Sequence, residues 1–246
     1  MSDQFGDRMK RYENGEVGRR FTPLLPVIVR LDGKCFSKWT SQLEKPYDNR
    51  MIDLMTQVTK ILVEESNARI GYTQSDEISL VLYSEDYTKP IYFDGKIHKI
   101  VSVLTSVATY WFNEFSLNLM PAEVSVDPGF FDCRAWTVPN QMEAVNSLLW
   151  RECDATRNSI NSAARMYYTH DELHGVSRDN VMDMLWEKGV NWNDYPSSFK
   201  RGVYVQKRPD LKNVNKKITQ VLELPPLSRI VNRVEVLFEG QDPHVQ

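Results

Sequence analysis

The sequence predicts an α+β fold whose β-α-β-β-α-β order forms a ferredoxin-like antiparallel sheet. Three observations predict it. Short apolar runs bounded by turn residues alternate with longer segments whose apolar residues recur every three or four positions. A short polar turn joins the second and third runs, and a proline ends the fourth. We expect a helical and mixed C-terminal extension beyond this core.

The first half of the pattern contains one strand, one helix and a hairpin. Residues 27–31 read Val-Ile-Val-Arg-Leu and predict a strand that Asp32 closes. Strands are expected at about 69–73 and 78–83, joined by the turn Gln74-Ser75-Asp76-Glu77. The helix between the first two strands is predicted by spacings of 4, 3 and 4 among its apolar residues, which are Met51, Met55, Val58 and Leu62.

The second half begins with a helix at about 97–117 and a strand at 130–138 that Pro139 stops. Asn140 and Glu143 predict a capping box that opens the next helix. We therefore expect a palm-like catalytic core over residues 1–139 and an extension over residues 140–246, packed together as one unit. The extension is expected to hold helices near 140–168 and 178–188 and a strand near 202–207.

Composition and charge limit the functions that the chain can have. Its 246 residues are 41% hydrophobic and 26% charged, with a net charge of −3, so nucleic acid would have to bind a local basic patch. No stretch approaches the roughly 18 apolar residues that span a bilayer, and we expect no membrane partner. The three cysteines form no CxxC pair, which favours a reducing, cytoplasmic location.

Three carboxylates are expected to meet at one edge of the sheet. The crossover makes the first two strands parallel, and the third strand runs the other way between them. Asp32 then lies beside Asp76 and Glu77. Oxygen ligands of this kind suit Mg²⁺, and two such ions could serve an in-line phosphoryl displacement. The alternative is that Asp32 caps a turn and that Asp76 and Glu77 form a solvated hairpin tip.

A tight turn directly after the first strand is a candidate for binding phosphate. Gly33 permits a close backbone approach, and successive N–H groups of the following residues can point at a triphosphate. The segment lacks the GxxxxGK[ST] pattern of a P-loop, so the turn by itself is weak evidence. It reads Asp32-Gly33-Lys34-Cys35-Phe36-Ser37.

Five motifs in order resemble those of the tRNA-histidine guanylyltransferase superfamily, in particular its guanylyltransferase-like branch of 3′–5′ RNA polymerases. The resemblance covers about residues 5–208, beginning with an N-terminal stretch, Gly6-Asp7-Arg8-Met9-Lys10-Arg11-Tyr12-Glu13. The motifs are Arg30-Leu31-Asp32-Gly33-Lys34-Cys35-Phe36, Lys45-Pro46-Tyr47-Asp48, Gln74-Ser75-Asp76-Glu77-Ile78-Ser79, Phe131-Asp132-Cys133-Arg134, and Trp150-Arg151 with Asp154.

The resemblance implies a polymerase-like palm that adds nucleotides to the 5′ end of tRNA, with ATP and GTP or other nucleoside triphosphates as substrates. It implies that Asp32, Asp76 and the Gly33 carbonyl hold two Mg²⁺ ions, with Glu77 alongside as a catalytic residue. The residues implied in nucleotide binding are the backbone of Lys34, Cys35, Phe36 and Ser37, and the side chains of Lys45, Asp48 and Ser75. Those implied in RNA binding are Arg157, Asn158, Lys200 and Arg201. A homotetramer is typical of the superfamily.

One departure bears on the reaction. Eukaryotic guanylyltransferases carry His-Ile-Asn-Asn-Leu-Tyr-Asn after the Trp-Arg segment, whereas this chain has Thr156 at the histidine position. Threonine has no acid–base capacity near neutral pH. The pattern from Asp154 to Ser159 resembles the guanylyltransferase-like branch, which is associated with template-dependent repair of 5′-truncated tRNA.

Three other functions stay open at this point. The first is addition of a single G to tRNA-His. The second is a nucleotide cyclase on the same palm, although the Gln74-Ser75-Asp76-Glu77 turn differs from the GG[DE]EF type. The third is a non-catalytic RNA-recognition module, which would present stacking aromatics on its central strands. The third strand instead reads Ile-Ser-Leu-Val-Leu-Tyr.

Overall fold

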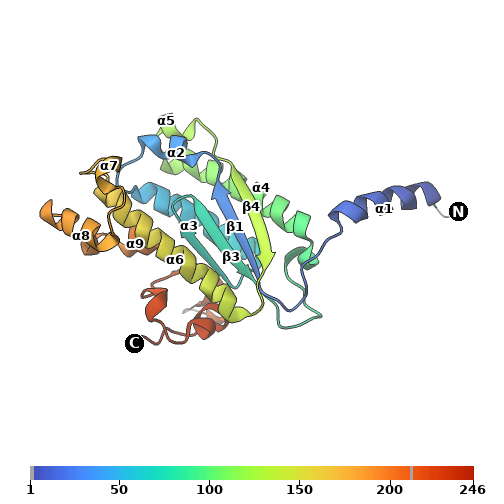
Figure 1. Ribbon diagram of the computed structural model, residues 1–246. Helices are drawn as coiled ribbons and strands as arrows, with labels where there is room; N and C mark the ends of the chain where they lie inside the picture. Colours follow the sequence, from blue (N-terminus) through green and yellow to red (C-terminus); the bar gives the residue numbers. More distant parts are fainter. Residues whose placement is uncertain (1–2, 211–212) are drawn as a thin grey trace.

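The computed structural model describes residues 3–210 and 213–246 and contains a six-stranded sheet in the order β4-β1-β3-β2-β5-β6 (Figure 1). Every neighbouring pair is antiparallel. The first four strands have the order of the predicted βαββαβ core, which is thereby confirmed. The strands are β1 Val27–Gly33, β2 Ile70–Gln74, β3 Glu77–Leu82, β4 Phe131–Thr137, β5 Val203–Asp210 and β6 Asn213–Leu222.

The helices follow the expected crossovers. Asp48 caps the first turn of α3, and the Asn140 side chain accepts from the Glu143 N–H at the start of α6. The Glu143 carboxylate contacts Asn146 rather than returning to the cap, so only half of the predicted capping box forms. The helices are α1 Gln4–Val17, α2 Phe36–Trp39, α3 Asn49–Ser66, α4 Ile97–Leu119, α5 Ala122–Ser125, α6 Gln141–Ala164, α7 His170–Leu173, α8 Arg178–Glu187 and α9 Ser197–Arg201.

One face of the sheet packs against α3 and α4. Odd-numbered residues of β1 point into this layer because side chains alternate along a strand. Val27, Val29 and Leu31 are each 0% exposed there. They belong to one apolar cluster with Leu54 of α3 and Leu104 of α4, and this burial fixes the direction in which β1 delivers Asp32.

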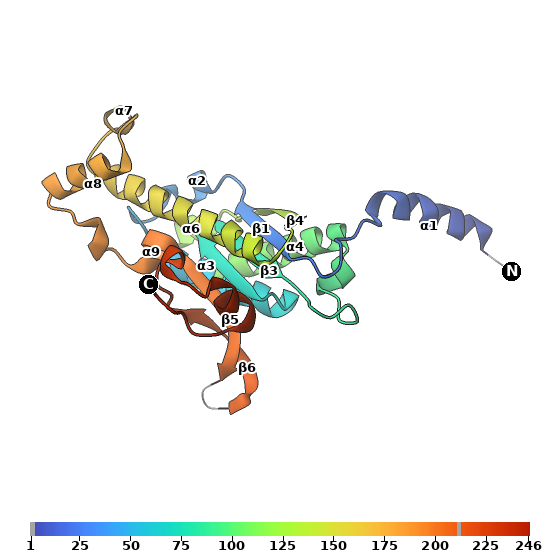
Figure 2. The same ribbon diagram turned by 60° about the horizontal axis from the view of Figure 1, so that its bottom comes forward.

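The opposite face is covered by α6 and the C-terminal segment (Figures 1 and 2). Leu148 of α6 and Leu237 of the tail join Ile28, Tyr72 and Tyr204 in a second apolar cluster. The predicted strand near 202–207 is β5, which pairs with β2 and is followed by β6. β6 was not predicted because Asn213–Leu222 contains polar and basic residues on an edge that faces solvent.

Two parts of the chain project from this body, helix α1 and the segment that contains the C-terminal half of α6 with α8. The C-terminal half of α6 packs with α8 in a third, smaller cluster that contains Ile160 and Leu185. Helix α1 extends away alone at the other end of the molecule (Figure 1). Among the helices that the structure describes, none is long and apolar enough to cross a membrane.

Candidate active site

The predicted carboxylates come together at one edge of the sheet. In the β1–β3 ladder, Asp32 is paired directly with Glu77, and Asp76 lies in the two-residue turn between β2 and β3. Ser75 adopts a left-handed φ of 53° in that turn, and its hydroxyl donates to Asp76 at 3.1 Å. The Gly33 N–H donates to the Asp76 carbonyl at 3.1 Å, which ties the end of β1 to the turn.

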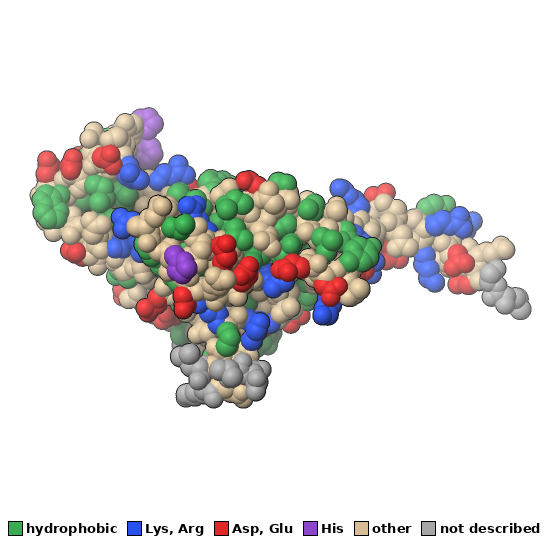
Figure 3. Space-filling model, turned by 90° about the horizontal axis from the view of Figure 1, so that it is seen from below, with side chains coloured by type: hydrophobic (Ala, Val, Ile, Leu, Met, Phe, Trp, Pro, Cys, Tyr) green, Lys and Arg blue, Asp and Glu red, His purple; other side chains and the backbone are tan. Residues whose placement is uncertain are grey.

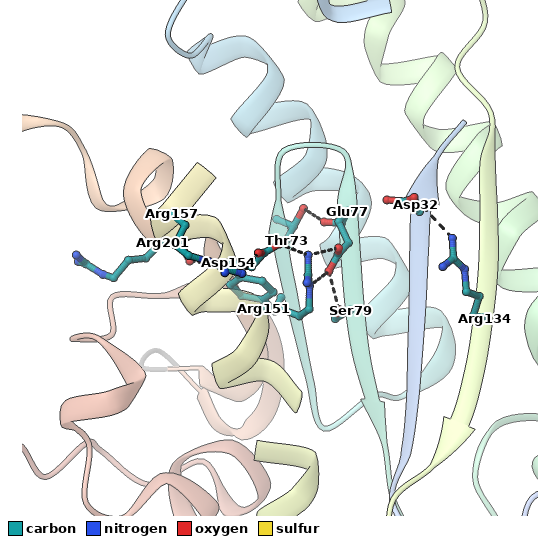
Figure 4. Close-up of polar contacts among 10 residues, drawn as sticks. Asp32, Thr73, Glu77, Ser79, Arg134, Arg151, Asp154, Arg157 and Arg201 are labelled. Atoms are coloured by element: carbon teal, nitrogen blue, oxygen red, sulfur yellow. Dashed lines mark hydrogen bonds and ion pairs between the residues drawn. The ribbon is translucent and has the colours of Figure 1, made fainter. Parts of the chain in front are cut away.

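The Glu77 carboxylate is held by an arginine from α6. Arg151 donates to both carboxylate oxygens at 2.7 Å, and Ser79 donates to one of them at 3.4 Å (Figure 4). The Glu77 and Arg151 side chains are only 11% and 13% exposed. A bidentate pair of this kind is among the stronger charge-assisted contacts. The catalytic role of Glu77 stays a prediction. In the structure both of its carboxylate oxygens accept hydrogen bonds from Arg151.

The ion pair continues along α6 toward solvent. Arg151 also donates to Asp154 at 3.0 Å, and Asp154 in turn accepts from Arg157, which is 62% exposed. Carboxylates and guanidinium groups therefore alternate from the β2–β3 turn to the surface of α6 (Figure 4). The arrangement places the predicted RNA contact Arg157 at the exposed end of this row.

Asp32 and Asp76 have fewer fixed partners. Arg134 of β4 lies 3.8 Å from Asp32 and 3.3 Å from Asp132, and all three side chains are about half exposed. Burial raises the pKa of the Asp76 carboxyl above its ordinary value, and the charges of Asp32 and Glu77 add to that shift. A carboxylate that is costly to ionise becomes easier to ionise when a cation binds next to it.

The donor set fits magnesium. No group of three His, Cys, Asp or Glu residues that could hold a metal is present in the described part of the chain. The Glu77 carboxylate is bound by Arg151, so Asp32 and Asp76 are the two of the three predicted carboxylates that remain available to a cation. Mg²⁺ is usually bound by one or two carboxylates and completes its shell with water and substrate phosphates.

The predicted triphosphate loop is anchored by an aromatic side chain. Phe36 is 3% exposed and lies within 5.6 Å, between ring centroids, of Trp39, Phe112 and Phe131. Only its backbone is therefore free to contact a ligand. A Cβ on Gly33 would lie 2.4 Å from the Phe36 ring, so glycine is required at that position.

The backbone amides of this loop divide into two sets. The Lys34 N–H already donates to the Phe130 carbonyl at 2.8 Å, which leaves Cys35, Phe36 and Ser37 as the amides available to phosphate. Cys35 has a left-handed φ of 59° and opens α2 without a side-chain cap. The Lys34, Cys35 and Ser37 side chains are exposed.

A cavity of about 410 Å³ opens beside the carboxylates. Pockets for small-molecule ligands commonly begin at about 300 Å³. Its lining includes Asp32, Ser75 and Asp76 from the sheet edge, and α6 contributes Asn158. Its apolar wall is formed by Leu43, Met51, Ile52, Met55, Phe199 and Val203. The cavity is therefore lined by both carboxylates and apolar side chains, and its size suits a small-molecule ligand such as a nucleotide.

The segment before α3 forms another wall of the cavity. The guanidinium of Arg50 donates to both carboxylate oxygens of Asp48, and the backbone N–H of Arg50 donates to one of them at 2.9 Å. The guanidinium lowers the pKa of Asp48. The ammonium of Lys45 donates to the Thr40 carbonyl at 3.1 Å. The structure thus places the predicted nucleotide ligands Lys45 and Asp48 at the cavity, and Asp48 shapes the segment through Arg50.

The predicted RNA-binding residues lie on two elements. Asn158 lines the cavity, whereas Arg157 is exposed beside it on α6. Lys200 donates to the Asn193 carbonyl and lies over the Trp192 ring at 5.2 Å, and burial lowers the pKa of its ammonium. The carbonyl of Arg201 accepts from Tyr72 at 2.9 Å.

Two features of the site were not assigned from the sequence. Arg151 belongs to one of the five motifs, but the sequence assigned it no role. The available signal was that Glu77, which is paired with Asp32 in the sheet, needs a cation nearby. Tyr47 and Phe199 stack at 4.7 Å between ring centroids at the cavity wall. No sequence signal joins these two rings, because they come from distant loops and short elements.

Comparison with known proteins identifies the family and supports the fold. Residues 6–139 match the family described as Thg1, tRNAHis guanylyltransferase. One similar solved structure is a bacterial tRNAHis guanylyltransferase-like protein in complex with ATP. The match covers 96% of this chain and 99% of that protein's chain, with 33% sequence identity and a TM-score of 0.84. A bacterial protein of the same description in complex with GTP gives 32% identity, 92% and 94% coverage and a TM-score of 0.77. The tRNA(His) guanylyltransferase of Neurospora crassa is 27% identical, over 76% of this chain and 69% of its own.

Proposed function

The chain belongs to the tRNAHis guanylyltransferase family of nucleotidyltransferases, and from that premise we propose that it adds nucleotides to the 5′ end of tRNA in the 3′–5′ direction. The proposed role is template-dependent repair of tRNAs that lack 5′ nucleotides. The observation that carries the proposal is the pair Asp32 and Asp76, which both line a cavity large enough for a nucleotide.

In the proposed reaction, a 5′-monophosphate oxygen of the tRNA first attacks the α-phosphorus of ATP, and pyrophosphate leaves. The 3′-hydroxyl of the incoming nucleotide then attacks the activated 5′ phosphorus, and AMP leaves. Asp32, Asp76 and the Gly33 carbonyl would hold two Mg²⁺ ions, which supply charge neutralisation and activation of the attacking oxygen when bound. Positioning and electrostatic stabilisation supply most of the catalysis in reactions of this class.

The residues of the chain have separate tasks in this scheme. The Cys35, Phe36 and Ser37 amides would bind the triphosphate, and the aromatic packing around Phe36 keeps those amides in place. The apolar wall of the cavity would receive the base. Arg151 holds Glu77, and thereby the β2–β3 turn that carries Asp76, in a fixed position.

Thr156 supports template-directed addition over obligatory addition of one G. Its hydroxyl donates to the Glu152 carbonyl of its own helix at 2.9 Å. The histidine of the eukaryotic motif therefore has no counterpart with acid–base capacity at this place. The nucleotide to be added would then be selected by pairing with the opposing 3′ strand.

The test is extension of a 5′-monophosphorylated tRNA that lacks its first nucleotide, with ATP, magnesium and each nucleoside triphosphate in turn. The product is resolved at single-nucleotide length on substrates that differ only in the opposing 3′ base. We expect the complementary nucleotide to be added in each case. Addition of G whatever the opposing base is would refute the template-dependent proposal.

Asp32→Asn and Asp76→Asn are each expected to abolish extension while the protein stays folded. The matched control is Asp53→Asn, which removes an exposed carboxylate on α3 outside the cavity. Near-normal extension by either site variant would contradict the carboxylate assignment. Production of cyclic nucleotide without RNA would instead favour a cyclase.

Three further properties belong to the proposal. The three cysteines are free, which supports a reducing cytoplasm as the site of action. The family resemblance supports a homo-oligomer, with the tetramer as the proposed form. The division into a palm-like core over 1–139 and an extension over 140–246 is also proposed; β5 and β6 of the extension continue the sheet of the core.

A further inference from the structure

Aromatic and basic side chains gather on the α6 side of the sheet, next to the carboxylates. Arg30 and Asp32 point to this side of β1 because side chains alternate along a strand. In the β1–β4 ladder Trp136 is paired with Ile28, which makes it a diagonal neighbour of Arg30. Strand β4 is the edge strand and lies beyond α6 in Figure 1. Helix α6 contributes Trp150, and we call Arg30, Trp136 and Trp150 the Trp–Arg cluster.

The contacts of Arg30 hold the cluster together. Its guanidinium carbon lies 5.5 Å from the ring centroid of Trp136 and 5.6 Å from that of Trp150. A guanidinium that lies over an aromatic face keeps N–H donors at its edges for other partners. Among the described residues no carboxylate forms an ion pair with Arg30, and Trp150 is 52% exposed. The cluster therefore presents a cation and an aromatic ring to a ligand.

The Trp–Arg cluster and the cavity lie on different sides of Asp32. Asp32 lines the cavity, whereas none of the three cluster residues does. Arg30 precedes Asp32 by two positions on the same face of β1, which corresponds to about 7 Å along the strand. A nucleotide in the cavity and a second ligand on the cluster would therefore meet at Asp32.

The chemistry of the cluster favours an unpaired RNA base as this second ligand. Unstacked RNA bases are commonly bound on aromatic rings and on arginine planes. Stacking tolerates every base because each has a π-face, and it leaves the base-pairing edge free. A base that templates addition has the same two requirements, since it can be any of the four and must pair with the incoming nucleotide.

The overall charge also favours a local contact over a broad basic surface. The chain has a net charge of −3, and Lys and Arg side chains are interspersed with Asp and Glu on the face drawn in Figure 3. Such a surface provides little sequence-independent attraction for phosphates. Stacking on a few well-placed side chains would therefore contribute a large share of the affinity for an RNA end.

We propose that the Trp–Arg cluster binds the unpaired base of the 3′ strand that templates addition, with Trp150 against the base and Arg30 against a neighbouring phosphate. The inference rests on the proposed function, because only template-directed addition uses such a base. The alternative is a structural role. The Arg151 guanidinium lies 4.6 Å from the ring centroid of Trp150, so the ring would then only cover the Arg151–Glu77 pair.

The first experiment measures the affinity of the full chain for two acceptor-stem hairpin RNAs that lack the first 5′ nucleotide. They differ only at the opposing 3′ position, which carries a base in one and is abasic in the other. Wild type is expected to bind the base-bearing RNA about 5- to 150-fold more tightly, the range found for stacking of one base. Fluorescence anisotropy with a label in the hairpin loop measures both constants.

Three variants separate stacking from a structural role. Trp150→Leu keeps an apolar cover but is expected to lose the preference for the base-bearing RNA. Trp150→Phe keeps an aromatic ring and should retain most of the preference. The matched control is Trp186→Leu, which removes an indole that is 67% exposed on α8 and should leave the preference unchanged.

The second experiment tests Arg30 through the salt dependence of binding. Arg30→Gln is expected to reduce the slope of log affinity against log salt concentration by about 0.7–0.9, the value for one phosphate contact. Arg30→Lys keeps the charge and should keep the slope. An unchanged slope in Arg30→Gln would remove Arg30 from the proposal.

Two binding results would overturn the proposal, namely equal wild-type affinity for the two RNAs, or an equal loss of affinity for both in Trp150→Leu. Extension assays separate its failure from that of the proposed function. Templated extension at the wild-type rate by Trp150→Leu would overturn the role of the cluster alone. Absence of extension by the wild type, with the base preference intact, would refute the proposed function and with it the templating role.

Discussion

Replacement of Arg151 by alanine should destabilise the protein strongly, because it leaves a buried carboxylate without a cation. Glu77 is 11% exposed at its side chain, and Ser79 at 3.4 Å is the hydrogen-bond donor that stays with its oxygens. Breaking a buried ion pair by removing one partner costs about 3–5 kcal/mol. For a chain of this size each kcal/mol lowers the melting temperature by about 2–4 °C, so the expected decrease is roughly 6–20 °C.

The reverse substitution should cost less. In Glu77→Ala, Arg151 keeps Asp154 at 3.0 Å as a counterion, so the loss should fall below the roughly 3–5 kcal/mol of a stranded buried charge. Removing both partners should cost less than the sum of the two single changes, by about 1.5 kcal/mol or more, since no unpaired charge then remains at this pair. Chemical denaturation of the four proteins gives this coupling free energy directly.

The coupling free energy decides whether the pair or the individual side chains matter. Additive losses within about 0.5 kcal/mol would refute the bidentate ion pair as the source of stability. Arg151→Lys provides a finer control, because an ammonium cannot form the two-pronged contact of a guanidinium. It should recover only part of the loss.

Three other predictions concern single positions. Gly33→Ala should cost about 1–3 kcal/mol in denaturation and weaken nucleotide binding, because a Cβ 2.4 Å from the Phe36 ring forces the loop to move; unchanged affinity would contradict the loop assignment. Burial raises the pKa of the Cys133 thiol to about 12, so iodoacetamide at pH 8 should label the two exposed cysteines long before Cys133, as peptide mass spectrometry can show. Burial also raises the pKa of Glu152 above its ordinary 4.5, so the folded state binds this proton more tightly than the unfolded state does. The free energy of unfolding should therefore fall as pH rises from about 4.5 through the raised pKa. Glu152→Gln should remove this pH dependence, and an unchanged pH dependence in the variant would show that Glu152 is not its source.

The sequence was a good guide to the fold of the core, since each core element had a local signal. The 3.6-residue period marked α3 and α4, and apolar runs between turn residues marked β1 to β4. The signal failed for β6, whose exposed edge requires no apolar face. It also failed for α1, because a helix with no buried residue has few apolar positions that could reveal it.

The site was predictable where backbone topology alone decides proximity. The strand order places β1 beside β3, and the end of β1 then lies next to the start of β3, where Asp32 pairs with Glu77. The direction of each side chain does not follow from it, and Glu77 turns to Arg151 on α6. The cavity is also lined by one face of α6, at Arg151, Asn158 and Ser162, whose spacings of 7 and 4 place them on the same side of the helix. This face can be recognised only when it is known which side of α6 is turned toward the sheet.

The ion pair also explains how neighbouring carboxylates in one turn can have different tasks. Three carboxylates at one edge would repel one another and disfavour the ionised state. Arg151 neutralises Glu77 and leaves the charges of Asp32 and Asp76 facing the cavity, with Arg134 as a looser counterion at 3.8 Å from Asp32. Two carboxylates of this kind match what Mg²⁺ takes from a protein when substrate phosphates complete its shell. In this arrangement Glu77 acts through the position of Asp76, so its conservative variant Glu77→Gln should reduce stability more than it changes the magnesium concentration needed for activity, whereas Asp76→Asn should abolish activity at any magnesium concentration.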